Sequence, residues 1–128
     1  MATLQKEICI SSDNKPGTLS RAAGCIKEAG VSVTGCCGWG EGGKANLYFL
    51  TDNNGKAVAA LQKGGYTCRE QEVVCCTLQN RVGTLAEACQ KLGQGGINID
   101  HCYVTAQGPN ALWVVYCNDN KKAQGLLP

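Results

Sequence analysis

The chain has 128 residues, ten of which are cysteine, and its 12 basic and 10 acidic side chains leave a formal charge of +2. No block of Lys or Arg could follow a phosphate backbone, so we expect no nucleic acid as a partner. The longest apolar stretch, 111–115, has the length of a strand. No apolar signal region opens the chain, so we expect a cytoplasmic protein without a membrane partner.

The first half of the chain predicts the order strand, helix, strand, strand, helix, strand. A β-branched run leads into a polar loop closed by Pro16 and Gly17, and apolar residues then recur at helical spacing from Thr18 up to Gly30. We expect Thr18 to be the N-cap of this helix, because its hydroxyl can accept a hydrogen bond from an amide of the first turn. The predicted strands and helices of this half lie at 7–11, 18–29, 31–39, 45–51, 56–63 and 66–70.

The second half repeats the first at an ungapped offset of 66 residues, which places Gly83 on Gly17. One offset carries a loop, a helix start, a helix stop and a strand together, so the repeat predicts two domains, 1–71 and 72–128. The fourth strand of the second copy would fall beyond residue 128. We expect either a shortened copy or another segment in that place. The predicted elements of this half lie at 72–77, 84–92, 97–105, 111–117 and 118–127.

The predicted fold class is α+β, with two tandem ferredoxin-like units of order βαββαβ, the second lacking a clear last strand. Glycine-containing turns at 40–43 and 107–110 join antiparallel strands. The compact arrangement for each unit is therefore an antiparallel sheet with both helices on one face. Units of roughly 60 residues are marginal alone, so we expect them to share a core or a sheet. The open sheet faces and the missing last strand favour a homodimer.

Two loops and one strand start carry a resemblance to a known family. The loops are Asn14-Lys15-Pro16-Gly17-Thr18-Leu19 and Asn80-Arg81-Val82-Gly83-Thr84-Leu85, and the strand start is Gly96-Ile97-Asn98-Ile99-Asp100. In element order, repeat length and motif, nearly the whole chain resembles the ACT domains, which are small ligand-sensing modules attached to amino-acid biosynthetic enzymes or standing alone. The resemblance implies that paired domains hold an amino acid between the first loop of one domain and the second strand of its neighbour. The second copy departs from the motif where Val82 replaces Pro16.

These loops have the chemistry that a free amino acid needs. The turn into the helix presents unpaired backbone N–H groups and the positive end of the helix dipole to a carboxylate. Gly17 leaves room for close approach. The amide of Asn14 can donate and accept, while Asp13 or Asp100 can face the ammonium. The candidate ligand-binding residues are Asp13, Asn14, Pro16, Gly17, Thr18, Leu19, Gln79, Asn80, Gly83, Thr84, Leu85, Ser32, Thr34, Asn98 and Asp100.

If loops and strands pair across the two copies, only one of the two pockets contains acidic side chains. The acidic pocket combines Asp13 and Asn14 with Asn98 and Asp100. The other pocket combines Gln79, Asn80, Ser32 and Thr34. We therefore expect two unequal sites, of which the first favours a cationic group more strongly. The plainer interpretation is that Asn-x-x-Gly between a strand and a helix forms only a turn and a cap.

The prediction is a non-enzymatic regulatory protein, without catalytic residues, cofactor or metal, that binds a free amino acid or a related small metabolite. The first alternative is a structural or regulatory subunit of a metabolic enzyme, without a ligand of its own. The second is a thiol-based metal site, because alternation along the strands places Cys36 and Cys102 on the open sheet face with Cys9 and Cys75, and His101 is near in sequence. The spacing is not that of Cys-x-x-Cys zinc sites, so we interpret the cysteines as reduced, small apolar residues.

Overall fold

The computed structural model describes all 128 residues and divides into two compact units. The first unit is Lys6–Gln71, and the second unit combines Met1–Gln5 with Glu72–Pro128. Six strands and four helices confirm the α+β class. None of the four helices has the length and apolar character that crossing a membrane requires.

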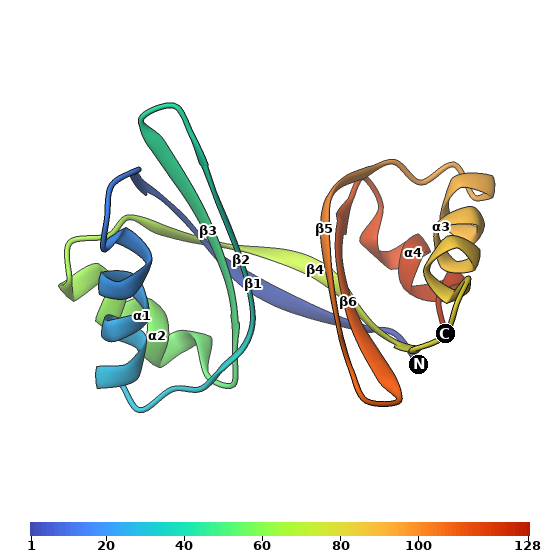
Figure 1. The fold of residues 1–128 in the computed structure, drawn as a ribbon, viewed down its shortest axis with the longest axis horizontal. Coiled ribbons are helices and arrows are strands. Elements are labelled where there is room, and N and C mark those ends of the chain that lie inside the picture. The colour runs from blue at the N-terminus through green and yellow to red at the C-terminus, as the bar shows by residue number, and fades with distance from the viewer. The chain divides into compact units, whose positions relative to one another are not determined.

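The first unit is a sheet with two helices packed on one face (Figure 1). Its hydrogen-bonded strand order is β2-β3-β1-β4. The core between sheet and helices contains Ile8 and Phe49 from the strands and Ile26 and Leu61 from the helices, each at most 1% exposed. The elements that contribute to this unit are β1 (Thr3–Asp13), α1 (Thr18–Glu28), β2 (Val33–Glu41), β3 (Lys44–Thr51), α2 (Asn54–Lys63) and β4 (Cys68–Gln79).

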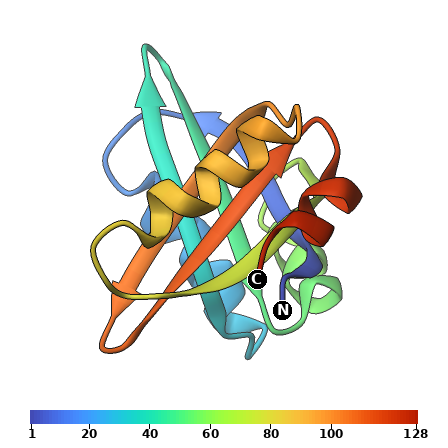
Figure 2. The same cartoon turned by 90° about the vertical axis from the view of Figure 1, so that its right-hand side faces the viewer.

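The second unit has the same arrangement, with the yellow-orange α3 and the red α4 on one face of its sheet (Figure 2). Its strand order is β5-β6-β4-β1. Trp113 and Val115 on the sheet pack with Leu92 of α3 and Ala123 of α4, all at most 1% exposed. The remaining elements are α3 (Thr84–Gln94), β5 (Ile99–Gln107), β6 (Asn110–Cys117) and α4 (Asn120–Leu126).

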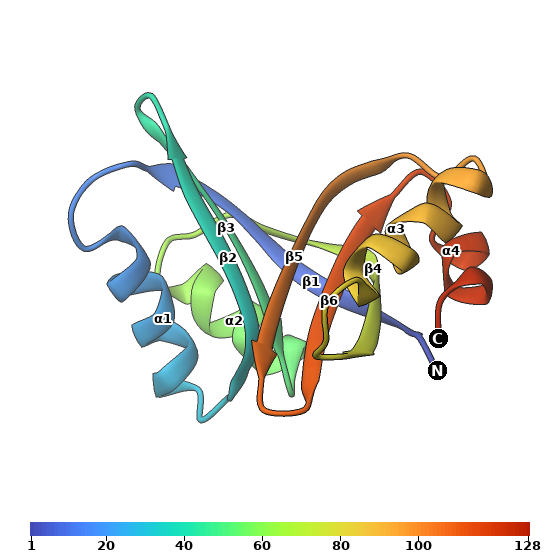
Figure 3. The same cartoon turned by 45° about the vertical axis from the view of Figure 1, so that its right-hand side comes forward.

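The strand that the second copy lacks is supplied by the start of the chain. Ala2 is 1% exposed within the second unit's core, and Leu4 packs against that core. Gln124 on α4 donates a hydrogen bond from Nε2 to the Ala2 carbonyl oxygen over 3.2 Å. The N-terminus accordingly lies beside the C-terminal end of the chain (Figure 3). The structure thus differs from the expected division into 1–71 and 72–128 at its first five residues.

Strands β1 and β4 are longer than the sequence predicts because each contributes to both units. The repeat suggests two strands, 66–70 and 72–77, whereas the structure has one continuous strand of 12 residues, Cys68–Gln79. The unit boundary falls within this strand, between Gln71 and Glu72, and that in β1 falls between Gln5 and Lys6. The second unit therefore takes its last strand from Met1–Gln5, whereas the first unit is the continuous segment Lys6–Gln71.

The prediction that Cys36 shares a sheet face with Cys9 is wrong. Cys36 pairs with Phe49, a core residue on the helix side, whereas Cys37 pairs with Tyr48, which is also the partner of Cys9. A register shift at the start of β2 causes the difference, because one extra residue moves every following side chain to the other face.

The same shift at the start of β5 corrects the placement of Cys102. Cys102 pairs with Val115 in the core of the second unit and therefore does not share a face with Cys75. The ring of His101 lies 5.3 Å from that of Tyr116. The structure contains no group of three His, Cys, Asp or Glu side chains placed to hold a metal ion.

Candidate ligand-binding loops

The glycine at the end of each repeated loop occupies the N-cap position of the helix that follows. Gly17 has φ 88° before α1, and Gly83 has φ 93° before α3. Residues with a Cβ rarely adopt this left-handed conformation, so the backbone itself requires glycine at both positions. Gly17 therefore has a conformational role in addition to the role we expect for it, which is to leave room for close approach of a ligand.

The prediction that Thr18 caps α1 is wrong, because Thr18 is the first residue inside the helix. Its hydroxyl donates to the Asp13 carbonyl oxygen over 2.7 Å, and Thr84 makes the same bond to Gln79 over 2.7 Å. The left-handed glycine places each threonine one residue past the cap, where its side chain reaches back to the end of the preceding strand. Each threonine side chain thus closes its loop and bonds none of the amides of the first helical turn.

The helices after the two loops are the ones whose N-termini no side chain caps. By contrast, Asn53 caps α2 by accepting a bond from the Lys56 amide, and Asp119 caps α4 by accepting one from Lys122. The first-turn amides of an α-helix have no partner within the helix. At α1, the amides of Leu19 and Ser20 are consequently available to an anionic group, which the helix dipole also favours.

Asn14 and Asn80 each fasten their loop to the neighbouring hairpin turn. Asn14 donates from Nδ2 to the Gly42 carbonyl over 3.2 Å, and Asn80 donates in the same way to Gly108 over 2.9 Å. The backbone amides of both residues also donate to the turns, over 3.0 and 2.9 Å. One N–H of each side-chain amide is committed to the fold, which leaves Oδ1 as an acceptor and the second N–H as a donor for a ligand.

A hollow of about 350 Å³ lies beside the first loop. Its far wall is the end of β2, where Gly38, Trp39 and Gly40 face the loop. A Cβ added to Gly40 would lie within 3 Å of the Asn14 side chain, and one added to Gly38 would lie 3.0 Å from a methyl of Leu47. Because they have no side chains, the two glycines leave room for the Asn14 side chain and keep the hollow open.

Sequence reasoning missed these residues of β2, although the repeat contains a signal for them. At the same positions the second copy has Val104, Thr105 and Ala106 in place of Gly38, Trp39 and Gly40. A comparison of the two copies, rather than of their common motif, would have indicated that only the first has an open strand end beside its loop. The ring of Trp39 is stacked on that of Tyr48, 5.3 Å away.

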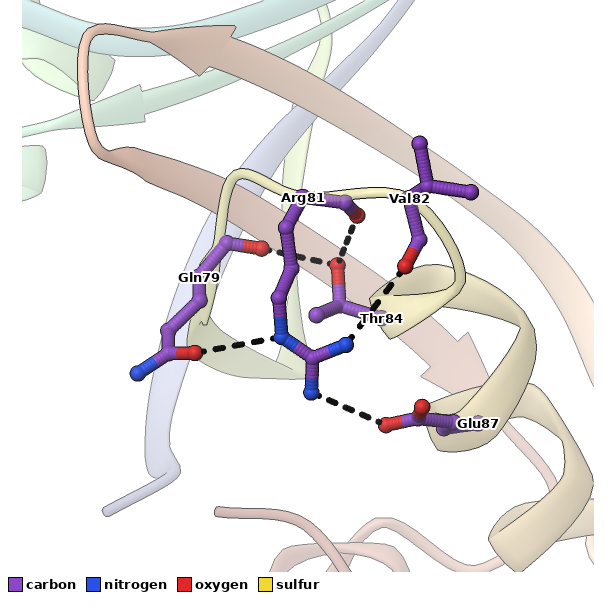
Figure 4. Close-up of polar contacts among 5 residues, drawn as sticks. All are labelled: Gln79, Arg81, Val82, Thr84 and Glu87. Carbon is purple, nitrogen blue, oxygen red and sulfur yellow. Dashed lines mark hydrogen bonds and ion pairs between the residues drawn. The ribbon is translucent and has the colours of Figure 1, made fainter.

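The two loops differ in how their charges are paired. In the second loop Arg81 forms an ion pair with Glu87 over 3.5 Å and also bonds Gln79 Oε1 and the Val82 carbonyl oxygen (Figure 4). A hollow of about 250 Å³ beside this loop is lined by Arg81, Glu87 and Lys91. The positive charge of Arg81 is thus offset by Glu87 in the first turn of α3.

The first loop keeps its positive charge. The repeat places Arg21 at the position of Glu87 and Lys15 at that of Arg81. Arg21 donates from Nη2 to the Thr18 hydroxyl over 3.3 Å and has no carboxylate partner. The first loop therefore presents two cations without a carboxylate partner, Lys15 and Arg21.

The structure does not bring the predicted strand residues to the loop of their own unit. Ser32 and Asn98 donate their backbone amides to Asp52 and Asn118 over 3.0 Å each, at the end of the hairpin opposite its turn. The remaining predicted residues that begin these strands are Thr34 and Asp100, and the exposed loop residues are Asp13, Pro16, Leu19 and Leu85. Pairing of these strand starts with the loop of the other copy stays a prediction.

Comparison with known proteins identifies the family to which the chain belongs. A family model described as an ACT domain pair matches residues 1–127. Protein BT0572 from Bacteroides thetaiotaomicron has 22% sequence identity and a TM-score of 0.91, over 98% of this chain and 87% of that one. The ligand-free regulatory subunit of aspartate kinase from Thermus thermophilus has 15% identity and a TM-score of 0.72, over 98% and 93%. A comparison with curated protein sequences gave no match. At these identities the solved structures show a shared fold, and the family model adds membership: the chain belongs to the family of ACT domain pairs.

Proposed function

We propose that this ACT domain pair is a non-enzymatic regulatory protein that binds a free amino acid or a related small metabolite at its repeated loops. The observation that carries the proposal is the contrast in capping. The helices α2 and α4 are capped by their own side chains, whereas α1 and α3, which follow the repeated loops, are not. Free amides at a helix N-terminus are suited to a carboxylate.

The first loop supplies partners for both ends of an amino acid. The amides of the first turn of α1 and the side chains of Lys15 and Arg21 favour the carboxylate. Asn14 Oδ1, whose amide nitrogen is held by Gly42, can accept from the ammonium. The hollow between this loop and β2 gives space for the side chain of the ligand.

The structural neighbours support a role in passing this occupancy to a metabolic enzyme. One is described as the regulatory subunit of aspartate kinase from Thermus thermophilus, and another as the alpha and beta subunits of aspartokinase, with a TM-score of 0.70. Binding would order the loop and favour one arrangement of the protein, which a partner enzyme then recognises.

The test is thermal unfolding of the purified protein with each of the twenty amino acids, because a ligand that binds only the folded state raises its stability. We expect a rise in Tm with one amino acid or a chemically related few, and calorimetry then gives the affinity. Lys15→Ala should weaken that binding, whereas Lys56→Ala, which removes another exposed lysine at the start of α2, should not.

The scan also separates the alternatives. If no amino acid shifts the Tm of a folded sample and the protein co-purifies with an enzyme, the proposal of a ligand is wrong and the enzyme-subunit alternative is favoured. Equal loss of affinity in Lys15→Ala and Lys56→Ala would place the ligand away from the first loop.

A further inference from the structure

A separate hollow of about 230 Å³ lies on the sheet of the first unit, formed by β1, β3 and the start of β4. It shares no lining residue with the hollow beside the first loop. Its polar lining side chains are Ser11 of β1, Asn46 and Tyr48 of β3, Thr67 directly before β4, and Arg69 of β4. Cys9, which is 5% exposed, contributes an apolar part of the wall.

Arg69 is held in position by a chain of hydrogen bonds that ends at a buried carboxylate. Its Nη1 donates to Gln71 Oε1 over 2.6 Å, and Gln71 Nε2 in turn donates to Glu7 Oε2 over 2.6 Å. Glu7 is fully buried. The neutral amide of Gln71 separates the two charges, so Arg69 has no carboxylate of its own and keeps N–H groups free for another acceptor.

The second copy shows that the fold does not need polar groups at these positions. The repeat places Val114 at the position of Tyr48 and Leu112 at that of Asn46. Both copies nevertheless form the same arrangement of sheet and helices. The polar wall in the first unit is therefore a specific property of that copy, beyond what the shared fold requires.

The groups that face the hollow match an anion with an apolar body. A guanidinium binds a planar carboxylate through two parallel hydrogen bonds, and the hydroxyls of Ser11 and Thr67 and the amide of Asn46 add donors. The Tyr48 ring and Cys9 offer apolar surface. Burial raises the pKa of Cys9 to about 12 and also raises the pKa of Tyr48, so neither group repels an anion at neutral pH.

We propose that this hollow is a second binding site, for a small organic carboxylate, with Arg69 as its anchor. A dry cavity of ~150 Å³ accommodates benzene, so a space of about 230 Å³ holds a carboxylate of the size of benzoate. The site is independent of the repeated loops, and its test uses other probes and other residues.

The test is a titration of the isotopically labelled protein with benzoate, followed by the amide signals in two-dimensional NMR. Benzoate should shift the amides of Ser11 and Arg69, and its neutral analogue benzamide should not. Arg69→Gln should weaken benzoate binding about tenfold or more, because it removes charge-assisted hydrogen bonds. The matched control is Lys56→Gln, which removes an exposed cation at the start of α2 in the same unit and should leave benzoate affinity unchanged.

A second variant keeps the proposal testable if Arg69→Gln does not fold. Tyr48→Val combined with Asn46→Leu gives the first unit the side chains of the second, so it should fold and lose benzoate binding. Full benzoate affinity in either folded variant, equal binding of benzamide, or shifts confined to the loop after β1 would overturn the proposal. Binding of inorganic phosphate but not of benzoate would also overturn it and indicate a site for inorganic anions.

Discussion

At the scale of single residues, the loop glycines differ from the glycine within α1 in whether the backbone conformation requires glycine. Gly17 has φ 88°, whereas Gly24 lies inside the helix with nothing within 4 Å of an added Cβ. We expect Gly17→Ala to lower the free energy of unfolding by about 1 to 2 kcal/mol, because alanine is strained in the left-handed conformation.

Gly24→Ala is the matched control for this prediction. It should raise the free energy of unfolding by about 0.5 to 1 kcal/mol, because alanine is the better helix former. Urea denaturation of the two variants measures both effects. The same sign of change for both would contradict the roles assigned to the two glycines.

Arg21 in the first copy corresponds to Glu87 in the second, so we expect the two loops to bind the ligand's carboxylate with unequal affinities. Glu87→Arg should release Arg81 from its ion pair and raise the affinity of the second loop about two- to fivefold, which is the range of a charge near a helix N-terminus. Arg21→Glu should lower the affinity of the first loop by a similar factor. Calorimetry that finds two identical sites in the unmodified protein would contradict this account.

Burial of Cys9 predicts that stability falls at alkaline pH. Desolvation raises the pKa of this thiol from 9.0 to about 12, with Arg69 opposing and Glu7 adding to the rise. Between these values the unfolded state loses the proton that the folded state retains, so stability is fully present below about pH 9 and declines toward pH 12. Urea midpoints measured from pH 8 to 10 should fall less steeply in Cys9→Ala. Equal slopes would show that Cys9 does not contribute.

At the scale of elements, the start of β1 is a structural part of the second unit. Ala2 is 1% exposed in that unit's core, whereas the adjacent Thr3 is exposed. Ala2→Asp should destabilise the second unit, because a buried, unpaired carboxylate loses its hydration, and Thr3→Asp should have little effect. Hydrogen exchange would then accelerate first in β6 and α3. Equal acceleration in both variants would mean that the segment does not pack as described.

The elements also show what the sequence could predict. Helical spacing and short apolar runs along both copies predicted nearly every helix and strand, because these patterns reflect burial on one face. The face of Cys36 could not be predicted, because a single-residue bulge leaves no trace in the alternation around it. The role of Thr18 was missed because capping and loop closure favour the same residue type.

The site was predictable only in part for the same kind of reason. The repeat identified the loops through Gly17 and Gly83, whose conformation is a local property of the chain. Trp39 and Arg69 line their hollows because strands that are distant in sequence lie side by side, and neither residue belongs to a repeated motif. Their positions follow from the register of β2, β3 and β4 and required the structure.

At the scale of the whole molecule, the continuity of β1 and β4 across the unit boundaries predicts cooperative unfolding. Each of these two strands lies partly in one unit and partly in the other, so unfolding of one unit frays the strands of the other. In Trp39→Phe, the fluorescence of Trp113 reports the second unit alone, and its urea transition should coincide with that of circular dichroism, which reports both. Two separated transitions would show that the units unfold independently.

One of the two arguments for the homodimer predicted from the sequence no longer holds. The missing strand of the second copy is filled by Met1–Gln5 of the same chain, so no second chain is needed to complete that sheet. The remaining argument is the open sheet faces, and sedimentation equilibrium is the measurement that decides the oligomeric state.

The place of Met1–Gln5 also sets an order of events during synthesis. The first unit is one continuous segment, Lys6–Gln71, and can form its sheet while the ribosome still makes the rest of the chain. The residues before it leave the ribosome earlier but must wait for a partner such as Gln124, 122 positions later. Until α4 emerges, the nascent protein therefore carries the unpaired strand end Met1–Gln5 together with a folded first unit. During this interval a neighbouring nascent chain can pair with that strand end.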